Sequence, residues 1–147
     1  MPVERSAGFI IFRSVPEGRK YLVLRSSRSD QSRSEFWDIP KGVLERGEKG
    51  IDTALREAAE EAGIKNPKVE EGFKETLRYF TKREGNTIPK FVAVFLASVE
   101  GETITLSEEH DCYLWLSYEE ARTRVTLVPL KKALDSAEAF LNSDRAL

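Results

Sequence analysis

The sequence predicts an α/β protein of the α+β type, in which helices cover a mixed, mostly antiparallel sheet. Two observations lead to this prediction: β-rich segments stand on both sides of a helix-forming segment, and helical patterns end the chain. The chain has 147 residues, which is a common size for one domain, and no repeat or linker divides it. We therefore expect a single domain over residues 1–147.

The N-terminal part of the sequence reads as strands and a loop. Residues 7–12 and 21–24 are rich in β-formers and are separated by Pro16-Glu17-Gly18, which predicts a hairpin. The serine-rich stretch 26–34 has almost nothing to bury, so we expect a mobile surface loop there. Residues 36–42 indicate one short strand that ends in Pro and Gly.

The middle of the sequence reads as a helix followed by a hairpin. Residues 49–62 are mostly good helix formers, and Gly63 supplies the expected C-terminal stop. The β-rich segments 69–83 and 88–99 predict a long hairpin, and residues 113–116 predict one more short strand.

The end of the sequence reads as two helices. Ser117 and Glu120 form the Ser-x-x-Glu pattern of a capping box, which predicts a short helix through about Arg124. A last amphipathic helix should follow Pro129. Its apolar stripe consists of Leu130, Leu134, Ala137 and Leu141.

Charge and composition exclude several classes of protein. Lys and Arg number 23 and Asp and Glu 25, so a net charge of −2 argues against a dedicated DNA or anionic-membrane binder. The longest apolar run, residues 91–97, is far below the ~18 residues of a membrane span, and the N-terminus lacks the order of a signal peptide. Cys112 is the only cysteine, which is compatible with a reducing compartment. We expect a cytoplasmic protein, and a monomer because no coiled-coil seam is evident.

Three carboxylates cluster in the predicted helix 49–62. At ~100° per residue, Glu57, Glu60 and Glu61 fall within about a 100° arc, and their like charges repel. Mg²⁺ binds through one or two carboxylates plus substrate phosphates, so the cluster is a candidate magnesium site. A solvated acidic face is the alternative. The side chains expected on roughly the opposite, sheet-facing side are Ile51, Leu55, Ala58, Ala59 and Ala62.

The residues around this cluster favour the metal site. From Gly42 the sequence reads Gly, five residues, Glu48, seven residues, and then Arg-Glu-apolar-x-Glu-Glu-x-Gly-apolar through Ile64. All nine defined positions of the Nudix box are matched, and the sequence resembles the Nudix hydrolases. The resemblance implies an α/β/α sandwich of the Nudix fold and a hydrolase that acts on a nucleoside diphosphate linked to another moiety, with Mg²⁺ or Mn²⁺.

The resemblance also assigns roles to residues of this chain. Glu57, Glu60 and Glu61 would be metal ligands, the Gly42 carbonyl a further one, and Arg56 would pair with Glu48 to hold the loop against the helix. Bridging metals neutralise a polyphosphate and lower the pKa of the attacking water, and a nearby carboxylate can take the proton.

The loop 106–110 supplies the candidates for the base. We favour Glu109 as base or as an additional metal ligand. For His110 we favour a structural role over a catalytic one, because nothing in its neighbourhood fixes its role.

Segments outside the box resemble one group of Nudix enzymes, the asymmetrical diadenosine tetraphosphate hydrolases. Lys41 and Lys90 would then contact substrate phosphates, and Tyr79 would stack on an adenine. The alternatives are a solvated edge lysine for Lys90 and a packed strand aromatic for Tyr79. The segments that carry the resemblance are Trp37-x-x-Pro40-Lys41-Gly42, Glu71-Gly72-Phe73-Lys74, Leu77-Arg78-Tyr79, Pro89-Lys90, the pattern from Leu106 to Leu116, and Glu119-Glu120-Ala121.

Two features depart from this group. Ile39 stands where the group commonly has the first of two prolines, and the loop ahead of Trp37 has no histidine. Arg28 and Arg33 in that loop are further phosphate candidates, although a mobile loop is the simpler interpretation.

The expected reaction is hydrolysis of diadenosine tetraphosphate to ATP and AMP. The alternatives with the same box are an RNA 5′-pyrophosphohydrolase and a diphosphoinositol polyphosphate phosphatase. A nucleotide-sensing module without hydrolysis is a third alternative, which the complete box disfavours.

Overall fold

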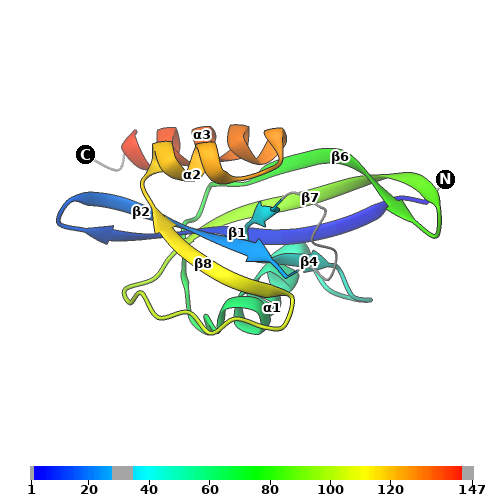
Figure 1. Ribbon diagram of the computed structural model, residues 1–147, viewed down its shortest axis with the longest axis horizontal. Helices are drawn as coiled ribbons and strands as arrows, with labels where there is room; N and C mark the ends of the chain where they lie inside the picture. The colour runs from blue at the N-terminus through cyan, green and yellow to red at the C-terminus, as the bar shows by residue number, and fades with distance from the viewer. Residues whose placement is uncertain (1, 28–34, 144–147) are drawn as a thin grey trace.

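An eight-stranded sheet forms the centre of the protein, with helices on both of its faces (Figure 1). The computed structural model describes residues 2–27 and 35–143, so Arg28 and Arg33 lie outside the described residues. The elements are β1 (Glu4–Val15), β2 (Gly18–Ser26), β3 (Trp37–Asp38), β4 (Lys41–Val43), α1 (Gly50–Ala62), β5 (Lys68–Val69), β6 (Glu75–Arg83), β7 (Asn86–Ser98), β8 (His110–Leu116), α2 (Tyr118–Arg124) and α3 (Val128–Asn142).

The sheet is built around β1. This strand pairs antiparallel with β2 and β4 and parallel with β7, while β7 also pairs antiparallel with β5 and β6. β3 and β8 both pair antiparallel with β2. Among the strand pairs of the described residues, β1 with β7 is the only parallel one, so the prediction of a mixed, mostly antiparallel sheet is confirmed.

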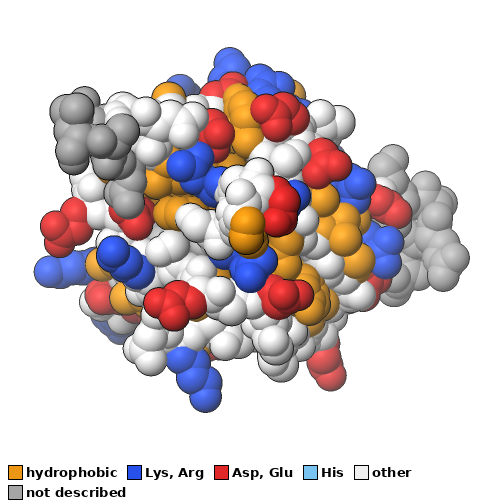
Figure 2. Space-filling model, turned by 90° about the vertical axis from the view of Figure 1, so that its left-hand side faces the viewer, with side chains coloured by type: hydrophobic (Ala, Val, Ile, Leu, Met, Phe, Trp, Pro, Cys, Tyr) orange, Lys and Arg blue, Asp and Glu red, His pale blue; other side chains and the backbone are white. Residues whose placement is uncertain are grey.

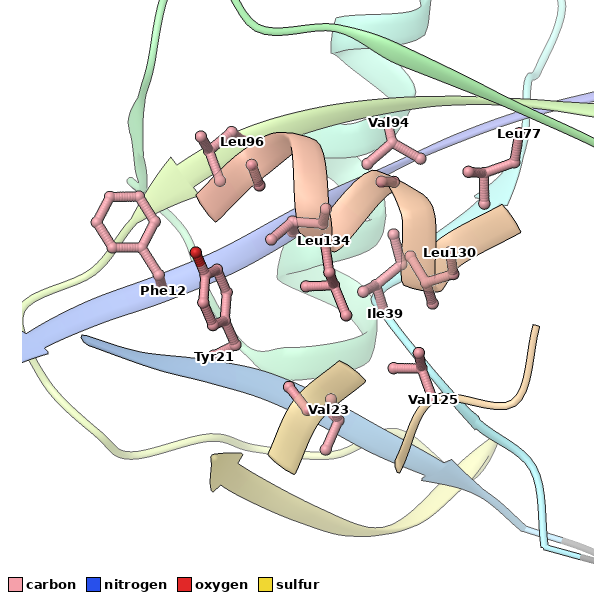
Figure 3. Close-up of a cluster of buried hydrophobic side chains, with 14 of the residues drawn as sticks. Phe12, Tyr21, Val23, Ile39, Leu77, Val94, Leu96, Val125, Leu130 and Leu134 are labelled. Atoms are coloured by element: carbon pink, nitrogen blue, oxygen red, sulfur yellow. The ribbon is translucent and has the colours of Figure 1, made fainter. Parts of the chain in front are cut away.

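The helices form two layers. α1 covers one face of the sheet, and α2 and α3 cover the other (Figure 1). Under α3, Leu130 and Leu134 meet strand residues such as Val94 and Leu96 (Figure 3), and the whole predicted stripe of α3 is buried. β1 is buried from Ser6 to Phe12 because helices cover both of its faces, which explains its continuous apolar run.

The helix signals of the sequence are confirmed. Gly63 follows α1 in the left-handed conformation, with φ of 71°, and its N–H bonds to carbonyls of the last turn. Ser117 accepts a hydrogen bond from the N–H of Glu120, as the capping box predicts. No helix of the described ranges is long and apolar enough to cross a membrane.

Two segments predicted as single strands are divided in the structure. Residues 69–83 comprise the end of β5 and the whole of β6, because a turn with Gly72 at φ of 91° lies between these strands. Residues 36–42 contain β3 and β4, which pair with different strands, β2 and β1. This separation places Asp38 and Lys41 side by side at the edge of the sheet, 3.0 Å apart between carboxylate and ammonium.

Candidate active site

A guanidinium–carboxylate fork fixes the loop that leads into α1. Arg56 donates from Nε to Glu48 Oε2 over 2.7 Å and from Nη2 to Glu48 Oε1 over 3.0 Å, so the predicted ion pair is present. The hydrogen bonds from Arg56 and those from the Glu45 N–H and the Thr53 hydroxyl lower the pKa of Glu48 to about 2. Arg56 also reaches the Val43 carbonyl over 3.1 Å. The fork therefore joins β4, the loop and α1 into one unit.

Two of the three clustered glutamates lie on the buried side of α1. Glu57 is 9% exposed and Glu61 5% exposed, on the same side as Ala54, Ala58 and Ala62. The prediction that the acids face away from the sheet is therefore wrong for these two. The reason is that α1 also packs against β4 at this point. The buried surface of the helix is therefore wider than the stripe of its apolar residues. Glu60 is exposed, and its carboxylate lies 3.3 Å from Arg56 Nη1.

Gly42 provides the space for the Glu57 carboxylate. A Cβ atom at Gly42 would overlap the carboxyl group of Glu57, so no larger residue fits there without moving that side chain. On its other side, Glu57 Oε2 accepts a hydrogen bond from Arg56 Nη1 over 2.8 Å. The carboxylate is thus held between a strand backbone and a guanidinium.

The Glu61 carboxyl group lies at the junction of α1 and β4. Its Oε1 accepts the backbone N–H of Lys41 over 3.1 Å. Burial, together with the negative charges of Glu57 and Glu109, raises the pKa of Glu61 to about 8. Burial also raises the pKa of Glu57, against the effect of Arg56. The site therefore contains carboxylates whose charged form is unfavourable unless a cation compensates it, and which otherwise tend to keep a proton.

A small polar pocket opens beside Glu61, with a volume of about 170 Å³. Glu109 lies in its wall. The backbone carbonyl of Glu109 accepts a hydrogen bond from the N–H of Ser27 over 2.8 Å. The structure thus brings Glu109 close to the box carboxylates, as the sequence predicts. The pocket is lined by Ser26, Phe36, Asp38, Ile39, Lys41, Glu61, Glu109 and His110.

The three predicted substrate-binding residues gather near this pocket. The Lys90 ammonium lies 5.9 Å from the centre of the Tyr79 ring. Burial opposes the charge of Lys41, but the carboxylate of Asp38 outweighs it, so the pKa of Lys41 is raised. Burial and the charge of Lys41 lower the pKa of Lys90. Two positive charges that act on each other are thus placed around one aromatic ring.

Lys90 is not a solvated edge lysine. It is 8% exposed, and its ammonium lies 2.9 Å from the carboxylate of Glu4. Tyr79 is half-buried and packs at the margin of the core under α3. Gly42 faces α1, whereas Tyr79 faces the α3 side. Lys41 joins the two sides of the sheet, because its backbone bonds to Glu61 and its side chain to Asp38.

Sequence reasoning missed two carboxylates, and the structure places His110, for which we favoured a structural role, in the wall of the pocket. Asp38 forms an ion pair with Lys41, and Glu4 forms one with Lys90. Strand pairing brings these carboxylates to the lysines, and no local spacing in the sequence reveals it. The three-residue separation of Asp38 and Lys41 is only a weak signal. His110 lines the pocket, and its buried Nδ1 has no hydrogen-bond partner among the residues that the structure describes. Burial lowers the pKa of His110, which favours the neutral imidazole.

The carboxylate oxygens of the site are the type of ligand that a hard divalent cation prefers, although they are not yet arranged around a common point. In the described ranges, no three His, Cys, Asp or Glu side chains are already arranged to hold a metal ion. The Glu57 carboxylate is instead engaged by Arg56, and that of Glu61 by a backbone N–H. Their burial and mutual repulsion are the conditions under which carboxylate oxygens gain from a divalent cation.

The NUDIX domain model matches residues 4–139, and the chain belongs to this family. It is a Nudix hydrolase, and Nudix hydrolases generally need a divalent metal ion. The bis(5′-nucleosyl)-tetraphosphatase [asymmetrical] of Mus musculus is 34% identical, with 97% of this chain and 98% of that protein covered. The enzyme of the same name from Sus scrofa is 35% identical, with 95% and 96% covered.

Solved structures agree with these sequence relatives. A binary complex of the C. elegans Ap4A hydrolase superposes with a TM-score of 0.81 and 29% identity, covering 94% of this chain and 97% of that one. The MutT protein of Methanosarcina mazei, at 23% identity and a TM-score of 0.73, has the same fold. The predicted Nudix fold is therefore confirmed.

Proposed function

We propose that this protein hydrolyses diadenosine tetraphosphate asymmetrically, to ATP and AMP. The observation that carries the proposal is the placement of the buried Glu61 next to Lys41 at one pocket, with the buried Glu57 on the same side of α1. Such a site offers carboxylates for a metal and a cation for phosphate. The names of relatives that align along nearly the whole chain support the choice of substrate.

The proposed roles follow the contacts of each side chain. Glu57, Glu60 and Glu61 would hold Mg²⁺, or Mn²⁺ in its place, with the Gly42 carbonyl and Glu109 as further ligands; of the three glutamates, we assign Glu60 the smallest share because it is exposed. The metal would neutralise the phosphate chain and acidify the attacking water. Glu109, at the pocket wall, would accept the proton of that water. Arg56 and Glu48 keep the loop in place for these steps.

The substrate would extend from the carboxylates to the α3 side of the sheet. Lys41 and Lys90 would share the phosphate chain, which offsets the repulsion between these two buried ammonium groups. An adenine would stack on Tyr79, a contact that contributes about 1–3 kcal/mol with little selectivity among bases. We propose that the chain acts in this way as a single domain over residues 1–147, as a monomer and in the cytoplasm.

A substrate panel tests the proposed reaction. Diadenosine tetraphosphate, a 5′-triphosphorylated RNA and a diphosphoinositol polyphosphate are each incubated with the protein and Mg²⁺ in ¹⁸O-labelled water. We expect the highest kcat/KM for diadenosine tetraphosphate, ATP and AMP in equal amounts, and the label in one of the two products. Two ADP molecules, or faster turnover of either other compound, would contradict the proposal.

A substitution at Gly42 tests whether the position of Glu57 matters. Gly42→Ala should lower kcat by roughly 10- to 100-fold, because the added methyl group displaces the Glu57 carboxylate. The backbone of Gly42 is not in the left-handed region, so alanine adds no backbone strain. Steady-state kinetics with diadenosine tetraphosphate measure the effect.

The control for this variant is Gly101→Ala, where a Cβ atom would meet no atom of the described residues within 4 Å. On a Glu57→Gln background, Gly42→Ala should lower kcat little further, because both changes act on the same carboxylate. Equal kcat values for the Gly42 and Gly101 variants would remove Gly42 from the site.

A further inference from the structure

Part of the sheet face on the α1 side is not covered by any helix of the described residues. The first residues of β1 and the hairpin of β6 and β7 extend beyond the N-terminal end of α1 (Figure 1). Strand pairing aligns Arg5, Phe91 and Arg78 in one row across the three strands, on the same side as Ala93, which packs toward α1. We call this surface the cationic face and define it by Arg5, Lys74, Arg78, Phe80, Lys82 and Phe91.

Cations and aromatic rings alternate on the cationic face. The guanidinium carbons of Arg5 and Arg78 lie 5.4 and 5.9 Å from the centre of the Phe91 ring. Phe80 is 65% exposed, although it is a large apolar side chain. Along β6, Arg78, Phe80 and Lys82 occupy successive positions of one face, in steps of about 6.7 Å.

Within the part of the chain that the structure describes, the strands of this face present no negative charge to it, although the whole chain has a net charge of −2. The positions of β1, β6 and β7 that point to this side carry no Asp or Glu, and Glu4 and Glu75 alternate to the opposite side. The end of the molecule with the β1–β2 turn differs, because acidic and basic side chains are mixed there (Figure 2). The cations are therefore gathered locally, which overall charge cannot reveal.

A hollow continues the cationic face toward α1. It has a volume of about 220 Å³, and Arg5, Lys74 and Phe91 line it together with Gly50, the first residue of the helix. Lys74 lies 5.9 Å from the centre of the Phe95 ring at this place. A flexible anionic chain could thus follow the cations from the hollow along β6.

We propose that the cationic face binds single-stranded nucleic acid. Regularly spaced cations hold a phosphate backbone, and an exposed aromatic ring between two of them accepts a stacked base, which is how sequence-tolerant single-strand sites are built. Arg5, Lys74, Arg78 and Lys82 contact phosphates, and Phe80 stacks on a base. The proposal does not depend on the reaction at the pocket, which involves other residues.

Fluorescence anisotropy with a labelled 15-nucleotide oligouridylate tests the proposal. The probe has a 5′-hydroxyl group and no phosphoanhydride, and the buffer contains EDTA, so hydrolysis plays no part. For single strands, the logarithm of the association constant falls with the logarithm of the salt concentration, with a slope of about −0.7 per phosphate contact. Arg78→Gln/Lys82→Gln removes two contacts and should therefore make this slope less negative by about 1.4. Extrapolated from 1 M to 0.1 M salt, this difference weakens binding by about 25-fold. Phe80→Leu should weaken binding by about fivefold or more, because leucine keeps apolar area but has no ring to stack on.

Matched variants decide what the probe binds. Lys65→Gln/Lys68→Gln removes two charges from exposed lysines elsewhere and should leave the slope unchanged. Lys41→Ala should also bind the probe as the wild type does. The proposal is overturned if the Lys65/Lys68 variant loses as much affinity as the Arg78/Lys82 variant, or if Lys41→Ala abolishes binding. It is also overturned if poly-glutamate competes as well as unlabelled oligouridylate, since the face would then take acidic polypeptides.

Discussion

Glu57→Gln and Glu61→Gln should each lower kcat for diadenosine tetraphosphate by roughly 100- to 1,000-fold at saturating Mg²⁺. Glutamine has nearly the same volume as glutamate but no charge, so the variants remove metal-binding capacity without a cavity. A loss of this size corresponds to about 3–4 kcal/mol of transition-state stabilisation, which is reasonable for impaired metal-ion catalysis. Stopped-time product analysis with Mg²⁺ titrations measures both kcat and the apparent metal affinity.

Glu60 and Glu119 provide graded controls for this experiment. Glu60 is exposed on α1 and its carboxylate forms a partly exposed ion pair with Arg56, so Glu60→Gln should lower kcat by less than about tenfold. Glu119 is an exposed glutamate of α2, so Glu119→Gln should behave as the wild type. Retention of more than a third of wild-type kcat by both Glu57→Gln and Glu61→Gln would refute the proposed catalytic role of the box carboxylates.

Local patterns predicted the elements of the fold well, because their causes are local. The stop of α1 at Gly63 depends on one glycine, and the start of α2 depends on the capping box of Ser117 with Glu120. The stripe of α3 was visible because one helical face packs on a single sheet.

The orientation of α1 could not be predicted from its own periodicity. A helical wheel assigns carboxylates to solvent, but Glu57 and Glu61 lie on the buried side beside Gly42 of β4. Burial of such groups costs free energy unless hydrogen bonds or a cation compensate. A functional site of this kind departs from the rule that apolar side chains are buried and charged ones exposed, which predicts the rest of the fold.

The ion pairs between neighbouring strands could not be predicted from the sequence either. Lys90 meets Glu4 because β1 and β7 run parallel in a register that pairs these two residues. The sequence predicts two β-rich segments but neither their pairing nor their register. The carboxylate partners of the proposed phosphate-binding lysines therefore emerge only from the structure.

Without metal, the protein should become less stable as the pH rises from about 4.5 to about 8. The folded-state pKa of Glu61 is about 8 against a reference value of 4.5, so in this window the folded state keeps a proton that the unfolded state releases. The free energy of unfolding then falls with rising pH, and the stabilisation is fully present only below the unfolded-state pKa. We expect a loss of about 2–4 kcal/mol attributable to Glu61 between pH 5 and pH 8.

Urea denaturation in EDTA isolates this contribution as the difference between the wild type and Glu61→Gln. The variant cannot titrate at this position, so it should be more stable than the wild type at pH 8, whereas the difference should largely vanish at pH 5. Mg²⁺ should restore the wild type at pH 8 by about 2.7 kcal/mol at one hundred times its Kd, and should help the variant less. Glu60→Gln, at an exposed position of the same helix, should follow the wild type at both pH values. If the difference in free energy of unfolding between the wild type and Glu61→Gln is the same at pH 5 and pH 8, Glu61 ionises in the folded state without an energetic cost. The argument that this carboxylate needs a cation would then be refuted.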